Sequence, residues 1–378
     1  MSTIINARSP YYVKLSQTDL YLAQVNIFIY AGVFTTDKAP SPQYVLNQYS
    51  PTGSEYVVLE ISEIIRDYLN TKYYEEAIDG VWVEIDYTLK DELGGTLTTG
   101  SLDYLAFDGF GYFNEGVNPR TSTDPTVSSY TPMVLQNNNT VYFVKGKDIR
   151  IPFFSEPSPT ASSDIDAGVW NEADYYWELS NFNWELVSVP QVINDNDNSL
   201  DKIQYLVIQS DFVQTGNTVT FTSNSGNPQE TVINFVEYCE PRYEPYRIIF
   251  YNKYGALQDI WCTKKSTINI STKDESYKAN VMDFTGSPDY SLYDHNKRRF
   301  NVEANQSITL NTDYLKEEYN DVVEQMLMSE QVWIENDTEV IPVVLKSKSL
   351  QLKTSVNDKL IQYTFEFDYA FDTIQNIR

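Results

Sequence analysis

Cysteine and histidine are almost absent from this chain of 378 residues, which contains two cysteines and one histidine. Cys239 and Cys262 form no CxxC or metal-ligand spacing, so we expect small buried groups or free thiols rather than a disulfide. Zinc lacks its usual ligands. A Ser-His-Asp or Cys-His arrangement would have to use His295, which lies in a polar, loop-like stretch. The lack of a disulfide framework suits folding in a cytoplasm.

Basic residues are also scarce, because 27 Lys and Arg stand against 53 Asp and Glu, for a net charge of -26. Such a chain does not coat a phosphate backbone, which requires clustered cations. An acidic wall repels DNA and therefore suits a protein that DNA passes without sticking. The only compact basic cluster is Lys297-Arg298-Arg299, with Lys264-Lys265 next. Either it is a solvated loop or it docks on an acidic patch of a neighbouring copy and sets the register between subunits.

Long apolar runs are missing as well. No stretch approaches the roughly 20 apolar residues of a membrane span. The first 15 residues lack the basic start and apolar run of a signal peptide. We therefore expect a soluble protein that is made inside a cell. No Gly-x-Gly-x-x-Gly follows a strand and no P-loop occurs, so nucleotide chemistry has no support.

Acidic residues offer only weak candidate sites. The stretch Asp195 to Ser199 begins like an EF-hand loop, but Leu200 and Leu206 stand where Gly and Glu are required. A weak surface cation site at Asp195 and Asp197 stays open, and Asp164–Gly168 has the same low weight. Glycoside hydrolysis needs only two carboxylates at a set separation, which a sequence does not give. We therefore single out no catalytic, cofactor-binding or metal-binding residue.

Aromatic residues, by contrast, are abundant at 14%, and 30 of them are tyrosines. Tyrosine suits strands and also wet interfaces, since it joins an apolar ring to a polar tip. With 42% hydrophobic residues the chain has material for a sizeable core, and its length allows two or three domains. These features favour an all-β scaffold that contacts other chains.

The pattern of residues 1–120 predicts an N-terminal β-sandwich of immunoglobulin or fibronectin type. Its clearest strand is Val81–Lys90, where every second residue is apolar, as in a half-buried strand. Thr96–Phe107 is the predicted hairpin partner of this strand. A short helix is predicted over Ile61–Leu69, with Ser62 as its cap. Further predicted strands are Tyr11–Leu15, Leu20–Tyr30, Tyr44–Tyr49 and Glu55–Glu60.

Residues 109–132 hold no periodic pattern and predict a linker, or an arm that reaches a neighbouring subunit. A second β-domain is predicted over residues 133–239. Its predicted strands are Thr140–Lys145, Arg150–Phe154, Trp177–Val189, Ile203–Ser210, Gly216–Thr222 and Glu230–Val236. A C-terminal β-domain is predicted over residues 240–378. Its predicted strands are Tyr246–Asn252, Leu257–Cys262, Val302–Leu310, Val332–Ile334, Val340–Leu345 and Leu360–Tyr369.

An amphipathic helix is predicted over residues 313–328, packed on the C-terminal β-domain. Asn311-Thr312-Asp313 would accept from the free N–H groups at its start. Its apolar residues recur at helical spacing: Leu315, Tyr319, Val322, Val323, Met326 and Leu327. Its outer face is acidic and could serve subunit contact or a channel: Glu317, Glu318, Asp321 and Glu324. The turn Asn336-Asp337 would join the two strands that follow. The fold class is therefore mainly β, with tandem sandwich or barrel domains and one helix.

Several of these segments together carry a family resemblance. They are the hairpin Tyr251–Trp261, the predicted helix with Leu310 before it, the strands Val332–Ile334 and Ile341–Val343, and the N-terminal stretch Ile5–Tyr12. In these segments the chain resembles structural proteins of tailed bacteriophages, including those of crAss-like and related marine phages.

The resemblance implies a non-enzymatic virion protein that forms a ring or hub in the neck or tail and contributes to the DNA-passage channel. Its partners would be further copies in a six- or twelve-fold ring and other neck or tail proteins. Cofactors, membranes and specific nucleic-acid binding would have no part, and the protein would be made in the host cytoplasm. Two other classes stay open: a carbohydrate-binding tail or surface adhesin, and a polysaccharide-degrading enzyme.

Overall fold

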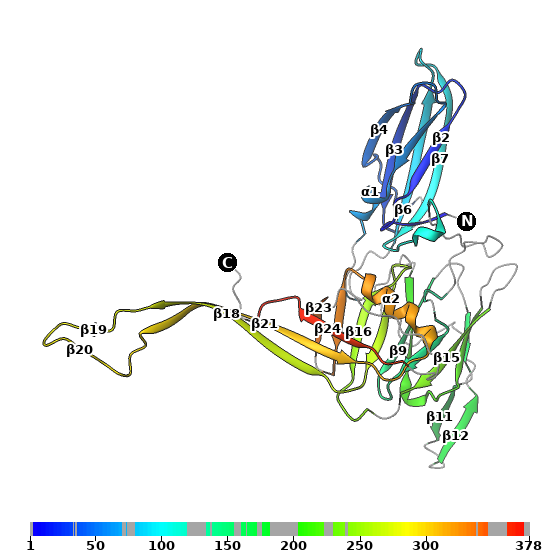
Figure 1. The fold of residues 1–378 in the computed structure, drawn as a ribbon. Helices are drawn as coiled ribbons and strands as arrows, with labels where there is room; N and C mark the ends of the chain where they lie inside the picture. Colours follow the sequence, from blue (N-terminus) through cyan, green and yellow to red (C-terminus); the bar gives the residue numbers. More distant parts are fainter. Residues whose placement is uncertain are drawn as a thin grey trace. The chain divides into compact units, whose positions relative to one another are not determined.

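The structure is a computed structural model. It describes residues 3–373, except positions 33, 35, 70–72, 74–79, 119–133, 137, 155–159, 164, 172–175, 182–202, 223–229, 239–240, 338 and 347–360. The chain is mainly β with several sheets and one longer helix near its C-terminal end, as predicted (Figure 1).

Two compact units make up the chain. Unit 1 comprises Met1–Glu240, Ile249–Ile260 and Asp321–Ser329, and unit 2 comprises Pro241–Ile248, Trp261–Asn320 and Glu330–Arg378. The three predicted domains, over residues 1–120, 133–239 and 240–378, stay predictions.

The N-terminal part of unit 1 contains two sheets over one core. The five-stranded sheet has the order β1-β7-β6-β3-β4, and a second sheet pairs β2 with β5. The bounds are Thr3–Asn6 (β1), Tyr12–Ser16 (β2), Leu22–Tyr30 (β3), Tyr44–Tyr49 (β4), Tyr56–Glu60 (β5), Gly80–Lys90 (β6) and Thr96–Phe107 (β7). Buried residues of both sheets, such as Val13, Val57 and Ile85, belong to the same core. The two-layer packing explains the period-two apolar pattern and confirms the predicted strands.

The short helix α1 (Ser62–Arg66) follows β5, but Ser62 is not its cap. Ile61 occupies the cap position and makes no side-chain cap hydrogen bond. The carboxylate of Glu60 instead accepts from the Ser62 N–H at 2.8 Å and the Tyr11 N–H at 3.3 Å. The predicted cap was therefore wrong, because a carboxylate two residues earlier takes the free N–H.

The middle part of unit 1 contains a four-stranded sheet of order β10-β14-β15-β8 and the pair β13–β9. The bounds are Thr140–Phe143 (β8), Asp148–Phe154 (β9), Thr160–Ser163 (β10), Ile203–Gln209 (β13), Thr218–Thr222 (β14) and Glu230–Glu237 (β15). Phe143, Ile151, Phe221 and Phe235 lie in one buried core. A separate hairpin pairs β11 (Asp166–Asn171) with β12 (Tyr176–Asn181). β12 covers part of the predicted strand Trp177–Val189, and the rest lies outside the described residues.

The C-terminal part of the chain contributes a seven-stranded sheet of order β17-β16-β22-β23-β24-β21-β18. The bounds are Tyr246–Tyr251 (β16), Leu257–Cys262 (β17), Thr267–Lys278 (β18), Lys297–Asn311 (β21), Val332–Glu335 (β22), Val340–Leu345 (β23) and Thr364–Tyr369 (β24). The predicted turn after β22 is confirmed, since the Asn336 side chain accepts from the Glu339 N–H at 2.9 Å.

The turn between β16 and β17 is organised by one buried side chain. The Asn252 amide donates to the Leu135 carbonyl at 2.7 Å and to Gln258 Oε1 at 3.2 Å. Its oxygen accepts from the N–H groups of Tyr254 at 2.9 Å and Ala256 at 3.1 Å. All four contacts lie within unit 1. Asn252 therefore both shapes the turn and fixes it to the segment that contains Leu135.

The longer helix is shorter than predicted. The helix α2 spans Asn320–Met328, and a 3-10 turn over Glu317–Tyr319 precedes it. Val322, Val323 and Met326 are fully buried, which confirms the apolar face. Neither α1 nor α2, the α-helices of the described ranges, is long and apolar enough to cross a membrane.

Sheet-like pairing explains why residues 313–316 are not helical. Leu315 and Ile361 exchange two backbone hydrogen bonds of 2.8 Å, and the Thr312 N–H donates to the Tyr363 carbonyl at 2.9 Å. Thr312 Oγ1 also accepts from the Tyr363 N–H at 2.9 Å. These backbone groups form sheet-like hydrogen bonds and are therefore not available for helical ones. The predicted start of the helix at residue 313 was wrong.

Candidate functional site

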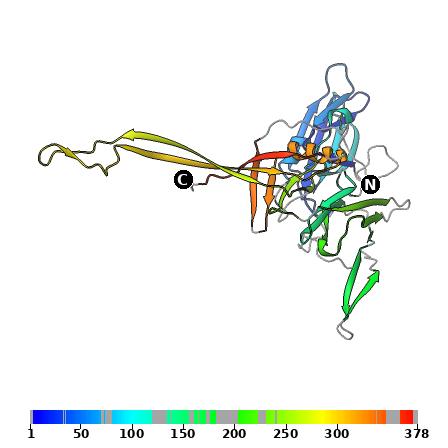
Figure 2. The same cartoon turned by 60° about the horizontal axis from the view of Figure 1, so that its bottom comes forward.

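The most exposed element of unit 2 is a long two-stranded ribbon, which we call the arm (residues 267–311). It consists of β18 and β21, joined at the far end by the short strands β19 (Met282–Asp283) and β20 (Asp289–Tyr290). The register runs from Thr267↔Thr309 to Lys278↔Lys297, with one irregularity at Lys273. Figures 1 and 2 both show β18 and β21 side by side, with β19 and β20 at their end. At about 3.3 Å per residue, the 12 residues of β18 span roughly 40 Å.

Most of the arm has no third strand beside it. β21 pairs with β24 only over Ser307–Asn311, and β18 is the edge strand of its sheet. All 12 residues of β18 are exposed. A two-stranded ribbon without a packed face is marginally stable in water, and an open edge is a template for pairing with another chain. The arm is therefore the part of unit 2 best suited to contact a partner.

The tip of the arm (residues 279–296) exposes large apolar side chains. Leu292 is 87% exposed, Tyr293 94% and Phe284 67%. Local hydrogen bonds shape the tip: Asp283 accepts from the Thr285 N–H at 2.8 Å and from its hydroxyl at 2.6 Å. These hydrogen bonds lower the pKa of Asp283. The tip thus presents apolar groups on a defined backbone, as protein-binding hairpins do.

Charge separates the arm from the rest of the chain. Residues 267–311 contain five Lys and Arg and six Asp and Glu, whereas the other residues contain 22 basic and 47 acidic ones. Within the arm, Lys278 lies directly opposite Lys297, and Arg298 lies opposite Tyr277. Arg299 pairs with Asp274 at 2.9 Å. Lys278, Lys297 and Arg298, which we call the cationic collar, make no ion pair with any residue in the described part of the chain.

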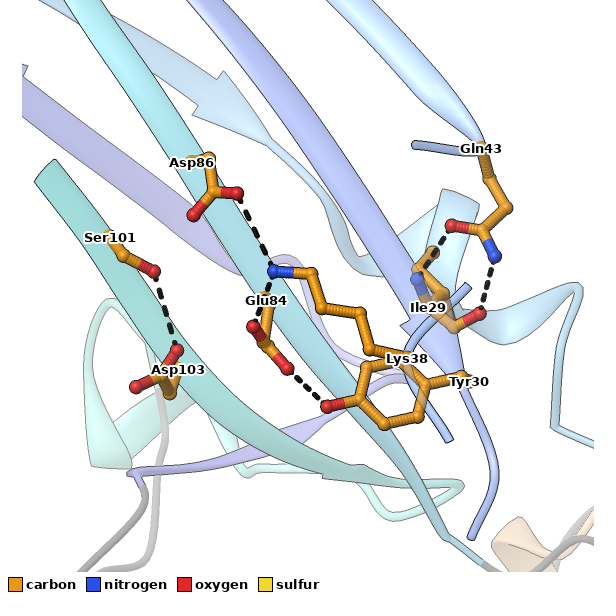
Figure 3. Close-up of polar contacts among 8 residues, drawn as sticks. All are labelled: Ile29, Tyr30, Lys38, Gln43, Glu84, Asp86, Ser101 and Asp103. Carbon is orange, nitrogen blue, oxygen red and sulfur yellow. Dashed lines mark hydrogen bonds and ion pairs between the residues drawn. The ribbon is translucent and has the colours of Figure 1, made fainter. Parts of the chain in front are cut away.

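A second polar cluster lies on the five-stranded sheet of unit 1 (Figure 3). Glu84 of β6 is only 6% exposed. Its carboxylate binds the Lys38 ammonium at 2.6 Å and accepts from the Tyr30 hydroxyl. Lys38 also reaches Asp86 at 3.5 Å. Burial lowers the pKa of Lys38, but the hydrogen bonds and charges of Glu84 and Asp86 outweigh burial and raise it overall.

The loop after β3 covers this face of the sheet. The Trp82 indole donates to the Gly32 carbonyl at 2.9 Å, and its ring lies 4.7 Å from that of Phe34. The Gln43 amide closes the loop with two 3.0 Å hydrogen bonds to the Ile29 backbone. Trp82 and Glu84 are consequently buried, so the prediction that β6 is half-buried holds only for its second half.

Asp103 of β7 lies directly opposite Glu84, so the cluster includes two facing carboxyl groups that the sequence could not single out. Burial raises the pKa of Asp103, and the charge of Glu84 adds to this, while Ser101 and Lys38 lower it. The ion pair between Glu84 and Lys38 ties the covering loop to β6. We interpret the cluster as structural.

Asp103→Asn is expected to raise the thermal unfolding midpoint at about pH 7 and to change it little near pH 4. Folding raises the pKa of Asp103, so the folded chain holds this proton more tightly than the unfolded chain. The contribution of Asp103 to the folding stability is therefore fully present at low pH, and it is lost as the pH rises through the raised pKa of the folded state. Scanning calorimetry at both pH values checks this. The exposed control Glu92→Gln should shift the midpoint at neither pH, and an equal gain from Asp103→Asn at both would contradict the assignment.

The other candidate residues from the sequence are one histidine, two cysteines and three aspartates. His295 is exposed at the tip. Cys262 is a buried free thiol whose pKa is raised by burial, as expected for an inert group. Cys239, Asp164, Asp195 and Asp197 lie outside the described residues. Among the residues that are described, no three His, Cys, Asp or Glu side chains gather to hold a metal ion.

A comparison with protein-family models finds no match to the chain, and a comparison with curated proteins finds none either.

Proposed function

We propose that the chain is a non-enzymatic structural protein of the virion of a tailed bacteriophage, where it forms part of a ring or hub in the neck or tail. The arm is the observation that supports this proposal. It extends two exposed strands over roughly 40 Å and ends in apolar side chains that no described residue covers. A surface of this kind fits a chain whose function is to hold neighbouring subunits together.

Energetics favour an assembly element over a free appendage. The exposed side chains of Leu292 and Tyr293 contribute no burial energy to the isolated chain. β18 is the edge strand of its sheet, so its outer edge has no partner strand there. A neighbouring subunit would bury the apolar tip and extend the ribbon, each of which stabilises a structure that is marginal alone. The net charge of -26 agrees with a place beside a DNA channel, since an acidic wall keeps DNA from adhering.

Replacing both tip residues, as Leu292→Asp with Tyr293→Asp, is expected to reduce incorporation of the chain into purified phage particles by about tenfold or more. Both side chains are almost fully exposed, so the substitutions should leave the fold intact. Quantitative mass spectrometry of particles from complemented infections measures the incorporation.

The matched control is Leu93→Asp, because Leu93 is 96% exposed at a hairpin turn outside the arm. This variant should enter particles at the wild-type level. The proposal fails if the wild-type chain is missing from purified particles, or if the tip variant is incorporated as well as the control.

A further inference from the structure

The cationic collar makes no ion pair with any described residue, and its charge therefore indicates the chemistry of its partner. Lys278 and Lys297 face each other across the ribbon, an arrangement that costs stability when nothing neutralises it. Within the described part of the chain, the Arg298 guanidinium donates to the His295 carbonyl at 3.4 Å and meets no carboxylate. With Leu292 and Tyr293 exposed just beyond, the partner should offer carboxylates beside an apolar surface.

An acidic row of matching spacing lies on α2, in unit 1 of the same chain. Asp321 and Glu324 follow one another at an interval of three residues, and we call them the acidic helix face. Residues three apart on a helix have Cβ atoms about 5–6 Å apart, and facing residues of a ribbon have theirs at about 5 Å. Asp321 is exposed and Glu324 is half-buried.

The negative charges of this row affect the pKa of the neighbouring residue Tyr112. Burial raises the pKa of the Tyr112 hydroxyl to about 12, and the charges of Glu324 and Asp321 are the next causes. The helix dipole accounts for Asp321 in the first turn of α2 but not for Glu324, which lies in the middle of the helix. A further cation near this row would therefore be stabilised.

We propose that the cationic collar of one copy docks on the acidic helix face of a second copy, and that the apolar tip packs beside it. The inference rests on the proposed function in one respect, which is that the arm is an assembly element. Because the two surfaces differ, the contact is heterologous and repeats from copy to copy, which gives a ring when the rotation closes.

Polyanions fit the collar less well than a second copy does. Binding to DNA or an anionic membrane gains affinity from many cations, on the order of six to ten phosphate contacts, whereas the collar has three. Outside residues 267–311 the chain carries 47 acidic residues against 22 basic ones, so its body would be repelled by either surface. That same body supplies the carboxylates a second copy needs.

Charge reversal and rescue test the contact in the full-length purified chain. Sedimentation velocity across a concentration series gives the association constant at low and at physiological salt. Lys297→Glu with Arg298→Glu should weaken self-association on the order of tenfold, as should Asp321→Lys with Glu324→Lys. All four substitutions in one chain should restore it, because the charges again complement each other.

Lys265→Glu is the control, since Lys265 is exposed at the base of the arm and outside the collar. It should leave the association constant unchanged. Rescue by the fourfold variant supports the docking. The inference is overturned if the wild-type chain does not self-associate, if rescue fails, or if the wild-type chain instead binds anionic vesicles or duplex DNA through the collar. A chain that stays monomeric yet needs its tip for particle incorporation would overturn this inference alone, whereas absence from particles would overturn the proposed function.

Discussion

Asn252→Ala is expected to lower the free energy of unfolding of unit 1 by about 3–5 kcal/mol. The Asn252 side chain is fully buried and joins four partners, two through its N–H₂ group and two through its oxygen. Alanine removes all four hydrogen bonds and leaves the Leu135 carbonyl and the N–H groups of Tyr254 and Ala256 to find new partners. A buried polar group without a partner costs about 1–3 kcal/mol, so the losses exceed those of an ordinary turn substitution.

Close packing around the turn prevents an easy relaxation. Gly255 has φ +76°, and a Cβ at this position would lie 3.0 Å from the Asp108 backbone. The Phe110 N–H also donates to the Lys253 carbonyl at 2.9 Å. The turn therefore cannot shift to let water reach the freed groups without breaking these contacts as well.

Urea unfolding followed by circular dichroism measures the effect of Asn252→Ala. Asn47→Ala is the matched control, since Asn47 is exposed on the edge strand β4, and it should change stability by less than about 0.5 kcal/mol. Asn252→Asp should be nearly as harmful as alanine, because a carboxylate cannot donate to Leu135 or Gln258. A stability loss below about 1 kcal/mol for Asn252→Ala would show that the turn does not depend on this side chain.

Val322→Asp is expected to abolish stable folding of unit 1, with a loss of about 4 kcal/mol or more. Val322 has no exposed surface and lies on α2 between other buried residues. An aspartate there would bury a charge without a partner, and a loss of this size is a large share of the roughly 5–15 kcal/mol that stabilises a domain. The hydrogen bonds of α2 and of the residue that follows it would be lost as well, since Gln325 accepts from the Lys253 N–H at 3.0 Å and Ser329 from the Tyr251 N–H at 3.1 Å.

Glu318→Lys is the companion variant, because Glu318 is exposed just before α2. It should fold like the wild type and alter only assembly. Hydrogen exchange with mass spectrometry separates the two results: protection of β16 and α2 should disappear in Val322→Asp and stay in Glu318→Lys. A folded Val322→Asp variant that assembles normally would show that this face of the helix is not buried.

The core strands could be predicted because burial leaves a mark in the sequence. Tyr44–Tyr49, Thr96–Phe107 and Leu257–Cys262 have the same bounds in the structure as in the prediction. Each lies on a core, so selection for burial produces alternating or continuous apolar residues. The helix start could not be predicted, since Thr312 resembles a helix cap and Leu315 fits the helical spacing, and yet they pair with residues 51 and 46 positions later.

The arm escaped prediction for the opposite reason. Every residue of β18 is exposed, so neither face of the strand requires apolar residues. The sequence of β18 therefore lacks the alternation of apolar and polar residues that identifies a strand. Only β21 was found, and only over Val302–Leu310, which includes most of the residues that pair with β24. The cluster around Glu84 was equally hidden, because the pairing of Glu84 with Asp103 depends on register and the reach of Lys38 depends on a loop. The basic cluster Lys297-Arg298-Arg299 was the one signal in the sequence that pointed to this surface.

The position of Lys278 and Lys297 on an open ribbon has a consequence for the chain before it assembles. Long exposed edges with apolar residues such as Ile268 and Ile270 are the usual seeds of edge-to-edge aggregation. Charged lysines on such an edge act as gatekeepers, since two ribbons that stack in register would bring four ammonium groups together. If the arm docks as proposed, the same repulsion would keep two arms from pairing with each other before they meet an acidic surface.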